Sequence, residues 1–101
     1  MELLTIQVGG PGVVFARHNR VRLPFTFSSP VAGASALLQS FRFINHDEDT
    51  HLKDVQVQLT PLFNAAESAT QGEVEIETTF RDEGPSLDRI EMEVVVLVVG
   101  T

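Results

Sequence analysis

The stretch Ile90-Glu-Met-Glu-Val-Val-Val-Leu-Val-Val99, near the end of this 101-residue chain, decides the fold. Successive side chains of an extended strand point to opposite faces. One face of this stretch is apolar throughout, whereas the other has Glu91 and Glu93 first and Val95, Leu97 and Val99 afterwards. In a small antiparallel domain, one face of each sheet usually packs on the core and the other is polar and exposed to water. We therefore expect a second copy of the chain to cover Val95, Leu97 and Val99.

The same alternation recurs along the chain, and helical periodicity does not. Residues 34–45 are ambiguous, because their first half suits a helix and their second half a strand, and we predict a strand. Six or seven short strands predict one all-β domain over residues 1–101, an antiparallel β-sandwich or barrel. The other strands are predicted around residues 4–8, 21–27, 55–59, 74–80 and 90–99.

Glycines and prolines mark where these strands should end. Gly9-Gly-Pro-Gly12 predicts a break after the first strand, and Pro61 predicts the end of the fourth. Pro24 indicates an edge or bulged strand, because proline has no N–H for a central position. The turn at residues 82–86, with Gly84-Pro85, predicts a hairpin that would bring Glu73, Glu75 and Glu77 near Glu91 and Glu93.

Composition excludes several classes of function. The net charge of −7 argues against nucleic acid and anionic membrane surfaces, which attract Lys and Arg. No cysteine is present, so disulfide and thiolate chemistry are excluded. No signal peptide or membrane-spanning segment is apparent, and we predict no membrane insertion. The absence of Trp and Tyr weakens any binding function that needs aromatic anchors.

Four segments of the chain stand in a characteristic order and spacing. An aromatic early strand ends in Ser-Pro, a central strand follows a polar loop, a third strand follows Thr-x-Gly, and a hydrophobic last strand ends at Gly. These segments are Phe25–Pro30, Leu52–Leu59, Thr70–Asp82 and Val96–Gly100. Through them, residues from about Asn19 to the end resemble the H-type lectin domain, a six-stranded antiparallel β-sandwich first known from snail agglutinins.

The resemblance implies a homo-trimer, sometimes doubled to a hexamer, whose last strands build the subunit contact. It also implies binding of galactose-type glycans near the junctions between protomers. Phe80 stands where the family has Trp, and Lys53 stands where it has Arg, which loses the planar two-pronged donor. Phe80 would stack on the sugar, and the residues expected to bind it through polar groups are Arg81, Asp82, Lys53, His51, His18 and Asn19.

Two further clusters have alternative interpretations. The segment 45–54 is rich in acids and imidazoles; a solvated loop is the simpler interpretation, and a divalent cation site would use His46, Asp47, Asp49 and His51. The basic segment 17–22 is either an exposed loop without a role or a surface that docks on an acidic patch of a neighbouring subunit.

No catalytic motif is present, and we predict that the protein is not an enzyme. No cofactor is expected apart from the cation considered above. We therefore expect a non-enzymatic, multivalent carbohydrate-binding module. The alternative is a structural or attachment module of a larger assembly, such as a phage or injection-machine component, that does not bind sugar.

Overall fold

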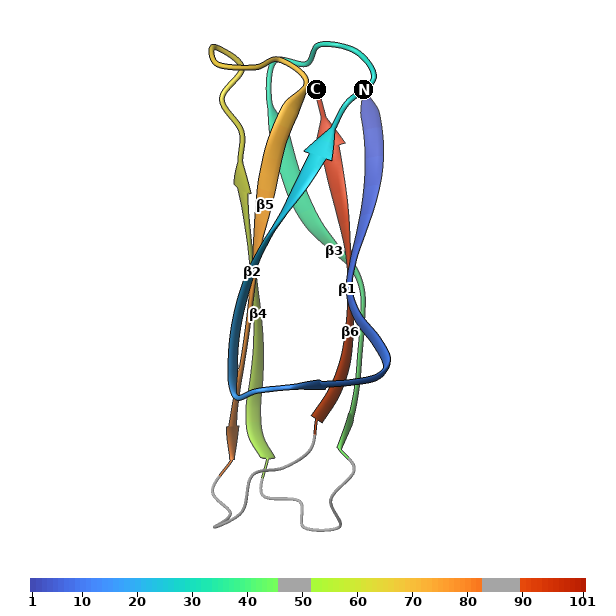
Figure 1. Cartoon of the computed structure of the whole chain (residues 1–101), viewed down its shortest axis with the longest axis vertical. Helices are drawn as coiled ribbons and strands as arrows, with labels where there is room; N and C mark the ends of the chain where they lie inside the picture. Colours follow the sequence, from blue (N-terminus) through green and yellow to red (C-terminus); the bar gives the residue numbers. More distant parts are fainter. Residues whose placement is uncertain (46–51, 83–89) are drawn as a thin grey trace.

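A computed structural model describes residues 1–45, 52–82 and 90–101 of the chain (Figure 1). The described chain forms two three-stranded antiparallel sheets, ordered β1-β6-β3 and β2-β5-β4. The predicted all-β antiparallel sandwich is therefore confirmed. The strands are β1 (Glu2–Phe15), β2 (His18–Thr26), β3 (Ala34–Asn45), β4 (Leu52–Leu62), β5 (Gln71–Asp82) and β6 (Ile90–Gly100).

The core lies between the two sheets and is centred on β5 and β6, the middle strand of each. Every second residue of β6 is buried, as the alternation in its sequence predicts. The β5 residues Val74 and Ile76 are buried opposite them. Full burial of a Val or Ile side chain contributes about 1.5–3 kcal/mol, so these two strands supply much of the stability. The buried apolar residues are Phe15, Phe25, Phe27, Val74, Ile76, Phe80, Ile90, Met92, Val94, Val96 and Val98.

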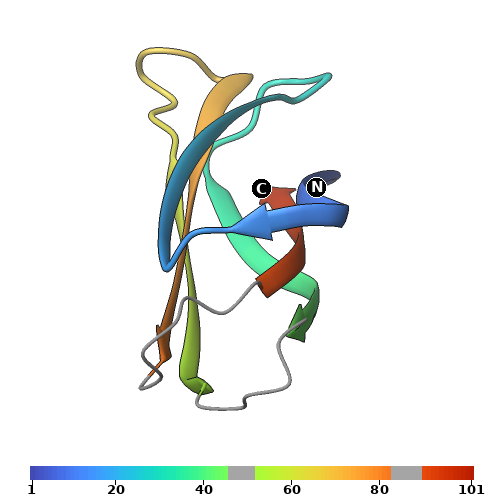
Figure 2. The ribbon, with the colours of Figure 1, turned by 60° about the horizontal axis from the view of Figure 1, so that its bottom comes forward.

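The predicted break at Gly9–Gly12 is wrong in part, because β1 continues beyond it. The register of β1 against β6 shifts between Gly9 and Val14, so the glycines form a bend within the strand. Gly9 has a φ of +78°, and a Cβ there would collide with the Met92 carbonyl oxygen. Figure 2 shows the end of β1 crossing from its own sheet towards β2.

Proline positions agree with the sheet edges. β2 contains Pro24 and is an edge strand, as predicted. β4 is the other edge of that sheet and continues one residue past Pro61 to Leu62, so the predicted strand end at Pro61 is wrong. Residues 34–45 form a strand, as predicted.

The predicted hairpin between the last two strands is wrong. β5 and β6 follow each other in sequence but belong to different sheets, and each lies in the middle of its own. Glu73, Glu75 and Glu77 therefore do not face Glu91 and Glu93. The tip of the predicted turn, at residues 83–86, lies outside the described residues.

Candidate functional site

The outer face of the β1-β6-β3 sheet combines an apolar area with a charged one. Val95, Leu97 and Val99 of β6 point outward and are half-buried by their neighbours. Leu3 lies opposite Val99 on β1, and Leu37 lies opposite Leu97 on β3. Leu3 is 55% exposed and Leu37 is 53% exposed. We call these five residues the apolar band.

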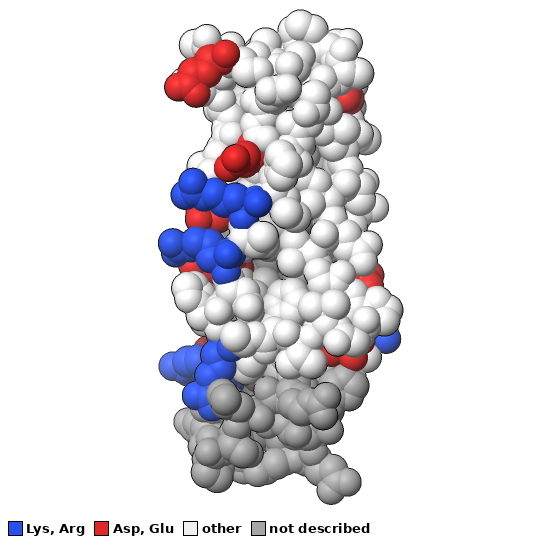
Figure 3. Space-filling model, in the orientation of Figure 1, with Lys and Arg blue, Asp and Glu red and all other residues white. Residues whose placement is uncertain are grey.

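Charge is distributed unequally between the two sheets. Figure 3 shows acidic and basic side chains gathered on the left, over the β2-β5-β4 sheet, and a largely uncharged upper right side, over the β1-β6-β3 sheet. The three strands of the latter sheet contain four charged residues, Glu2, Arg42, Glu91 and Glu93. Glu2 accepts hydrogen bonds from Ser28 Oγ and, with a smaller effect, from Ser28 N, and both lower the pKa of its carboxyl. The apolar band therefore lies on the less charged side of the molecule.

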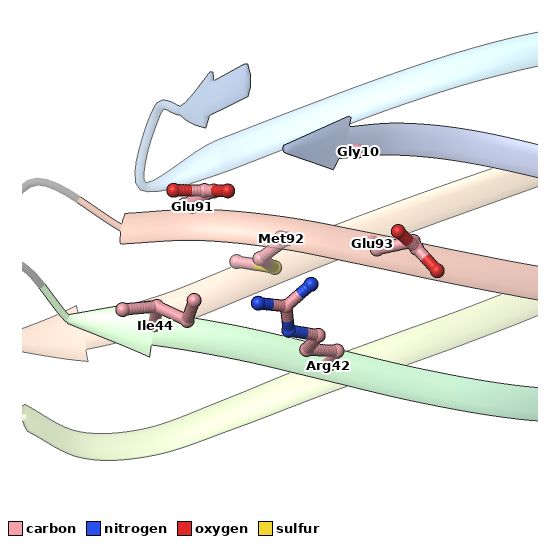
Figure 4. Close-up of a pocket in the computed structure, with 6 residues that line it drawn as sticks. All are labelled: Gly10, Arg42, Ile44, Glu91, Met92 and Glu93. Atoms are coloured by element: carbon pink, nitrogen blue, oxygen red, sulfur yellow. The ribbon is translucent and has the colours of Figure 1, made fainter. Parts of the chain in front are cut away.

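The charged area lies on the same outer face, towards the β6 start. Arg42 on β3 is directly opposite Glu93 on β6, and Ile44 is opposite Glu91. Gly12 N donates a hydrogen bond of 2.7 Å to the Glu91 carboxylate. An open depression of about 150 Å³ lies here, and it is lined by Gly10, Arg42, Ile44, Glu91, Met92 and Glu93 (Figure 4). This depression is too small for a sugar.

Phe80 does not occupy the position that sugar stacking requires. Its side chain is only 2% exposed and packs in the core with Phe15, Ile90 and Met92. Phe80 shares the inner face of β5 with Val74, Ile76 and Thr78, which precede it at two-residue intervals. The predicted stacking role of Phe80 is therefore wrong in this structure.

Arg81, a residue of the expected sugar site, is accessible and forms an ion pair with Asp54, which was not predicted to belong to the site. Arg81 Nε lies 3.0 Å from Asp54 Oδ2, and the Arg81 side chain is 71% exposed. The backbones of Lys53 and Asp82 lie in β4 and β5 next to this pair, but their side chains are outside the described part of the structure. His51 lies outside the described residues altogether.

His18 and Asn19 begin β2 and are separated by the alternation of the strand. His18 pairs in register with Thr79, two residues from Arg81 on the same outer face. Asn19 pairs with the buried Thr78, and its Nδ2 donates a hydrogen bond of 2.7 Å to Ala16 O. The structure thus brings His18, Arg81 and Asp54 to one face and directs Asn19 away from it.

Sequence analysis missed an ion-pair ladder across β2 and β5. Arg20 Nη2 lies 2.7 Å from Glu77 Oε2, and Arg22 Nε lies 3.6 Å from Glu75 Oε1. His18 Nε2 lies 2.8 Å from the same Glu77 oxygen. Two side-chain hydrogen bonds lower the pKa of the Glu77 carboxyl; the one with His18 has the larger effect, and the one from Arg20 has the next largest. The signal was present in the sequence: two arginines and two glutamates, each pair with a two-residue spacing, fit a cross-strand ladder.

This ladder bears on the predicted docking role of segment 17–22. Arg20 and Arg22 are paired with glutamates of their own chain, so neither is an unpaired cation awaiting an acidic neighbour. Exposed pairs of this kind contribute little to stability, because solvent screens the charges. Within the described residues, the ladder is a solvated outer face of the sandwich.

The structure does not test the cation site considered for segment 45–54. His46, Asp47, Asp49 and His51 lie outside the described residues. Elsewhere in the described chain, no three His, Asp or Glu side chains come close enough together to hold a metal ion.

Comparison of the chain with family models, with curated proteins and with solved structures finds no match. A search of the described residues also finds no helix of the length and apolar character needed to cross a membrane.

Proposed function

We propose that this protein is a non-enzymatic binding and assembly module that works as a homo-oligomer. The observation that supports this proposal is the outer face of β6, which is polar at Glu91 and Glu93 and apolar at Val95, Leu97 and Val99. Leu3 and Leu37 extend the apolar part over both neighbouring strands. An apolar area that remains accessible to water supports an interaction site, because burying it releases water.

A second copy is the partner that this band fits. The band is self-complementary in chemistry, because it consists of Leu and Val side chains that pack equally well against their own kind. Most soluble oligomers are symmetric assemblies of identical chains. The resemblance to the H-type lectin domain suggests three copies, with the last strands in contact.

The mass of the protein in solution tests this part of the proposal. We expect the wild-type chain to sediment as an oligomer of the 11.1 kDa protomer and Leu97→Asp to sediment as a monomer, because an unpaired charge in a buried contact is costly. Leu62→Asp is the matched control, since Leu62 is exposed on the outer face of the other sheet. A monomeric wild type, or an oligomeric Leu97→Asp variant, would contradict the proposal.

Carbohydrate is the ligand that we propose for the assembled module. Support comes from the family resemblance and from the exposed polar group of His18, Arg81 and Asp54, whose donors and acceptors suit sugar hydroxyls. Several shallow sites in one assembly would gain avidity through effective concentration. The burial of Phe80 leaves this group without the expected stacking surface.

The alternative is a structural or attachment module that assembles in the same way and binds no sugar. The burial of Phe80 and the Arg81–Asp54 ion pair favour this alternative. Titration of the oligomer with galactose and N-acetylgalactosamine separates the two functions. Saturable binding that is lost in Arg81→Ala supports the sugar-binding function, and no binding by an intact oligomer leaves the structural one.

A further inference from the structure

The ion-pair ladder across β2 and β5 stops one step before the end of these strands. Its last pair joins Arg22 to Glu75. The next outward positions are Pro24 and Glu73, which face each other in register. Proline offers no charge, and within the described residues no hydrogen bond or ion pair engages the Glu73 carboxylate. This acid is therefore free to meet a cation from outside the chain.

A pocket of about 400 Å³ lies beside Glu73 and opens to water. Its floor is the outer face of β2 and β5, where Pro24 and Thr26 lie opposite Glu73 and Gln71. Ser68 adds a wall from the connection between β4 and β5, at the top of Figure 1. Pockets for small molecules have volumes of about 300–1,000 Å³, so this one has room for a small ligand. We call it the Glu73 pocket.

The connection that carries Ser68 is held by its own hydrogen bonds. Ser68 N donates to Asn64 O at 3.0 Å, and Phe27 N donates to Thr70 O at 2.7 Å. Ser68 Oγ accepts a hydrogen bond of 3.1 Å from Gln71 N, which fixes the hydroxyl beside the start of β5. The wall of the pocket is thus formed before binding, and a preformed site loses less conformational entropy when its ligand arrives.

The polar groups of the Glu73 pocket suit a ligand that has both an amine and hydroxyls. The ionised Glu73 carboxylate is an acceptor only, and its strongest partner is a positively charged N–H donor. The Ser68 hydroxyl accepts from the backbone and keeps its own O–H to donate. Thr26 and Gln71 each offer a donor and an acceptor, and the Pro24 ring offers an apolar surface. This combination matches a sugar ring that carries a protonated amine.

We propose that the Glu73 pocket binds an amino sugar, with the amine at Glu73 and the ring hydroxyls at Ser68, Thr26 and Gln71. This site goes beyond the proposed function, because it needs one protomer only and shares no residue with the group around Arg81. Eight positions of β5 separate Glu73 from Arg81, a distance of about 26 Å along an extended strand. The two sites can therefore be tested separately.

NMR titration of the backbone amides with galactosamine tests the proposal, at about pH 6, where carboxylates are ionised and amines are protonated. We expect saturable shifts at Ser68, Gln71 and Glu73, with a millimolar dissociation constant, because water screens an exposed carboxylate. Galactose and N-acetylgalactosamine, which have the hydroxyls without the charge, should bind at least about tenfold more weakly. Butylamine, which has the charge without the hydroxyls, should also bind at least about tenfold more weakly.

Matched variants assign the charge to one residue. Glu73→Gln should weaken galactosamine binding at least about fivefold and remove its advantage over galactose. Glu67→Gln is the control, since it loses the same charge from an exposed residue of the neighbouring connection that does not line the pocket. Arg81→Ala should bind galactosamine in the pocket as the wild type does.

Three results would overturn the proposal. Equal binding of galactosamine and galactose, or no binding of galactosamine, would show that the pocket does not recognise the amine. Equal binding of butylamine and galactosamine would show that it holds a cation without recognising a sugar. Wild-type binding in Glu73→Gln would show that another group meets the amine. Shifts confined to the surroundings of Arg81 would overturn this inference and leave the proposed function standing.

Discussion

Thr78 is a polar residue at the centre of the core. It lies on β5 between Asn19 of β2 and Val57 of β4, and it is 1% exposed. Its Oγ1 has no hydrogen-bond partner in the described part of the chain. A buried hydroxyl without a partner costs about 1–3 kcal/mol relative to one that is satisfied.

We predict that Thr78→Val stabilises the protein by about 1–2 kcal/mol, because valine keeps the shape and removes the unpaired hydroxyl. Urea unfolding measures this change. Thr79→Val, on the outer face of the same strand, should change stability by less than about 0.5 kcal/mol. A loss of stability in Thr78→Val would show that the hydroxyl is bonded in solution.

The stability of the folded protein depends on pH through the carboxyl group of Glu77. Its pKa is lowered by His18 and Arg20, so the folded state favours the charged carboxylate. This stabilisation is present above the ordinary glutamate pKa of about 4.3 and is lost as the pH falls through the lower folded value. We predict that His18→Ala/Arg20→Ala raises the pKa of Glu77 towards its ordinary value, as measured by NMR titration of the carboxyl group. An unchanged titration would show that the ladder does not persist in solution.

At the scale of the strand, sequence alternation predicted which residues are buried more reliably than it predicted where strands end. The two-residue pattern of β6 is reproduced residue by residue. The same pattern in β5 places Phe80 on the inner face with Val74 and Ile76, whereas the family resemblance assigned Phe80 to a surface site. Consistent use of the alternation would have predicted the burial of Phe80.

Glycine positions are harder to interpret from sequence, because a glycine ends a strand in one context and bends it in another. Gly9 bends β1 at a close approach to Met92 and Phe15. We predict that Gly9→Ala destabilises the protein by more than about 1 kcal/mol, through both its positive φ and the collision of the new Cβ. Gly12→Ala separates the two effects, because Gly12 also has a positive φ but has open space around it. Equal losses in the two variants would contradict the steric account.

At the scale of the whole molecule, the sequence predicted the fold class but not the pairing of strands. A turn between consecutive strands indicates a hairpin, yet β5 and β6 lie in opposite sheets. Which strands pair depends on contacts far apart in sequence, such as Arg20 with Glu77, that no local pattern specifies on its own. The same limit applies to the sugar site, whose residues come from three strands and from segment 46–51, outside the described residues.

The proposed assembly depends on contact between copies through the apolar band. The chain contains no cysteine, so a single introduced thiol reports on one position only. Leu97→Cys, treated with a short bifunctional thiol cross-linker, should give covalently linked copies at protein concentrations where Leu62→Cys stays monomeric on a denaturing gel. Equal cross-linking of the two variants, or none in Leu97→Cys while the protein is oligomeric, would contradict the account.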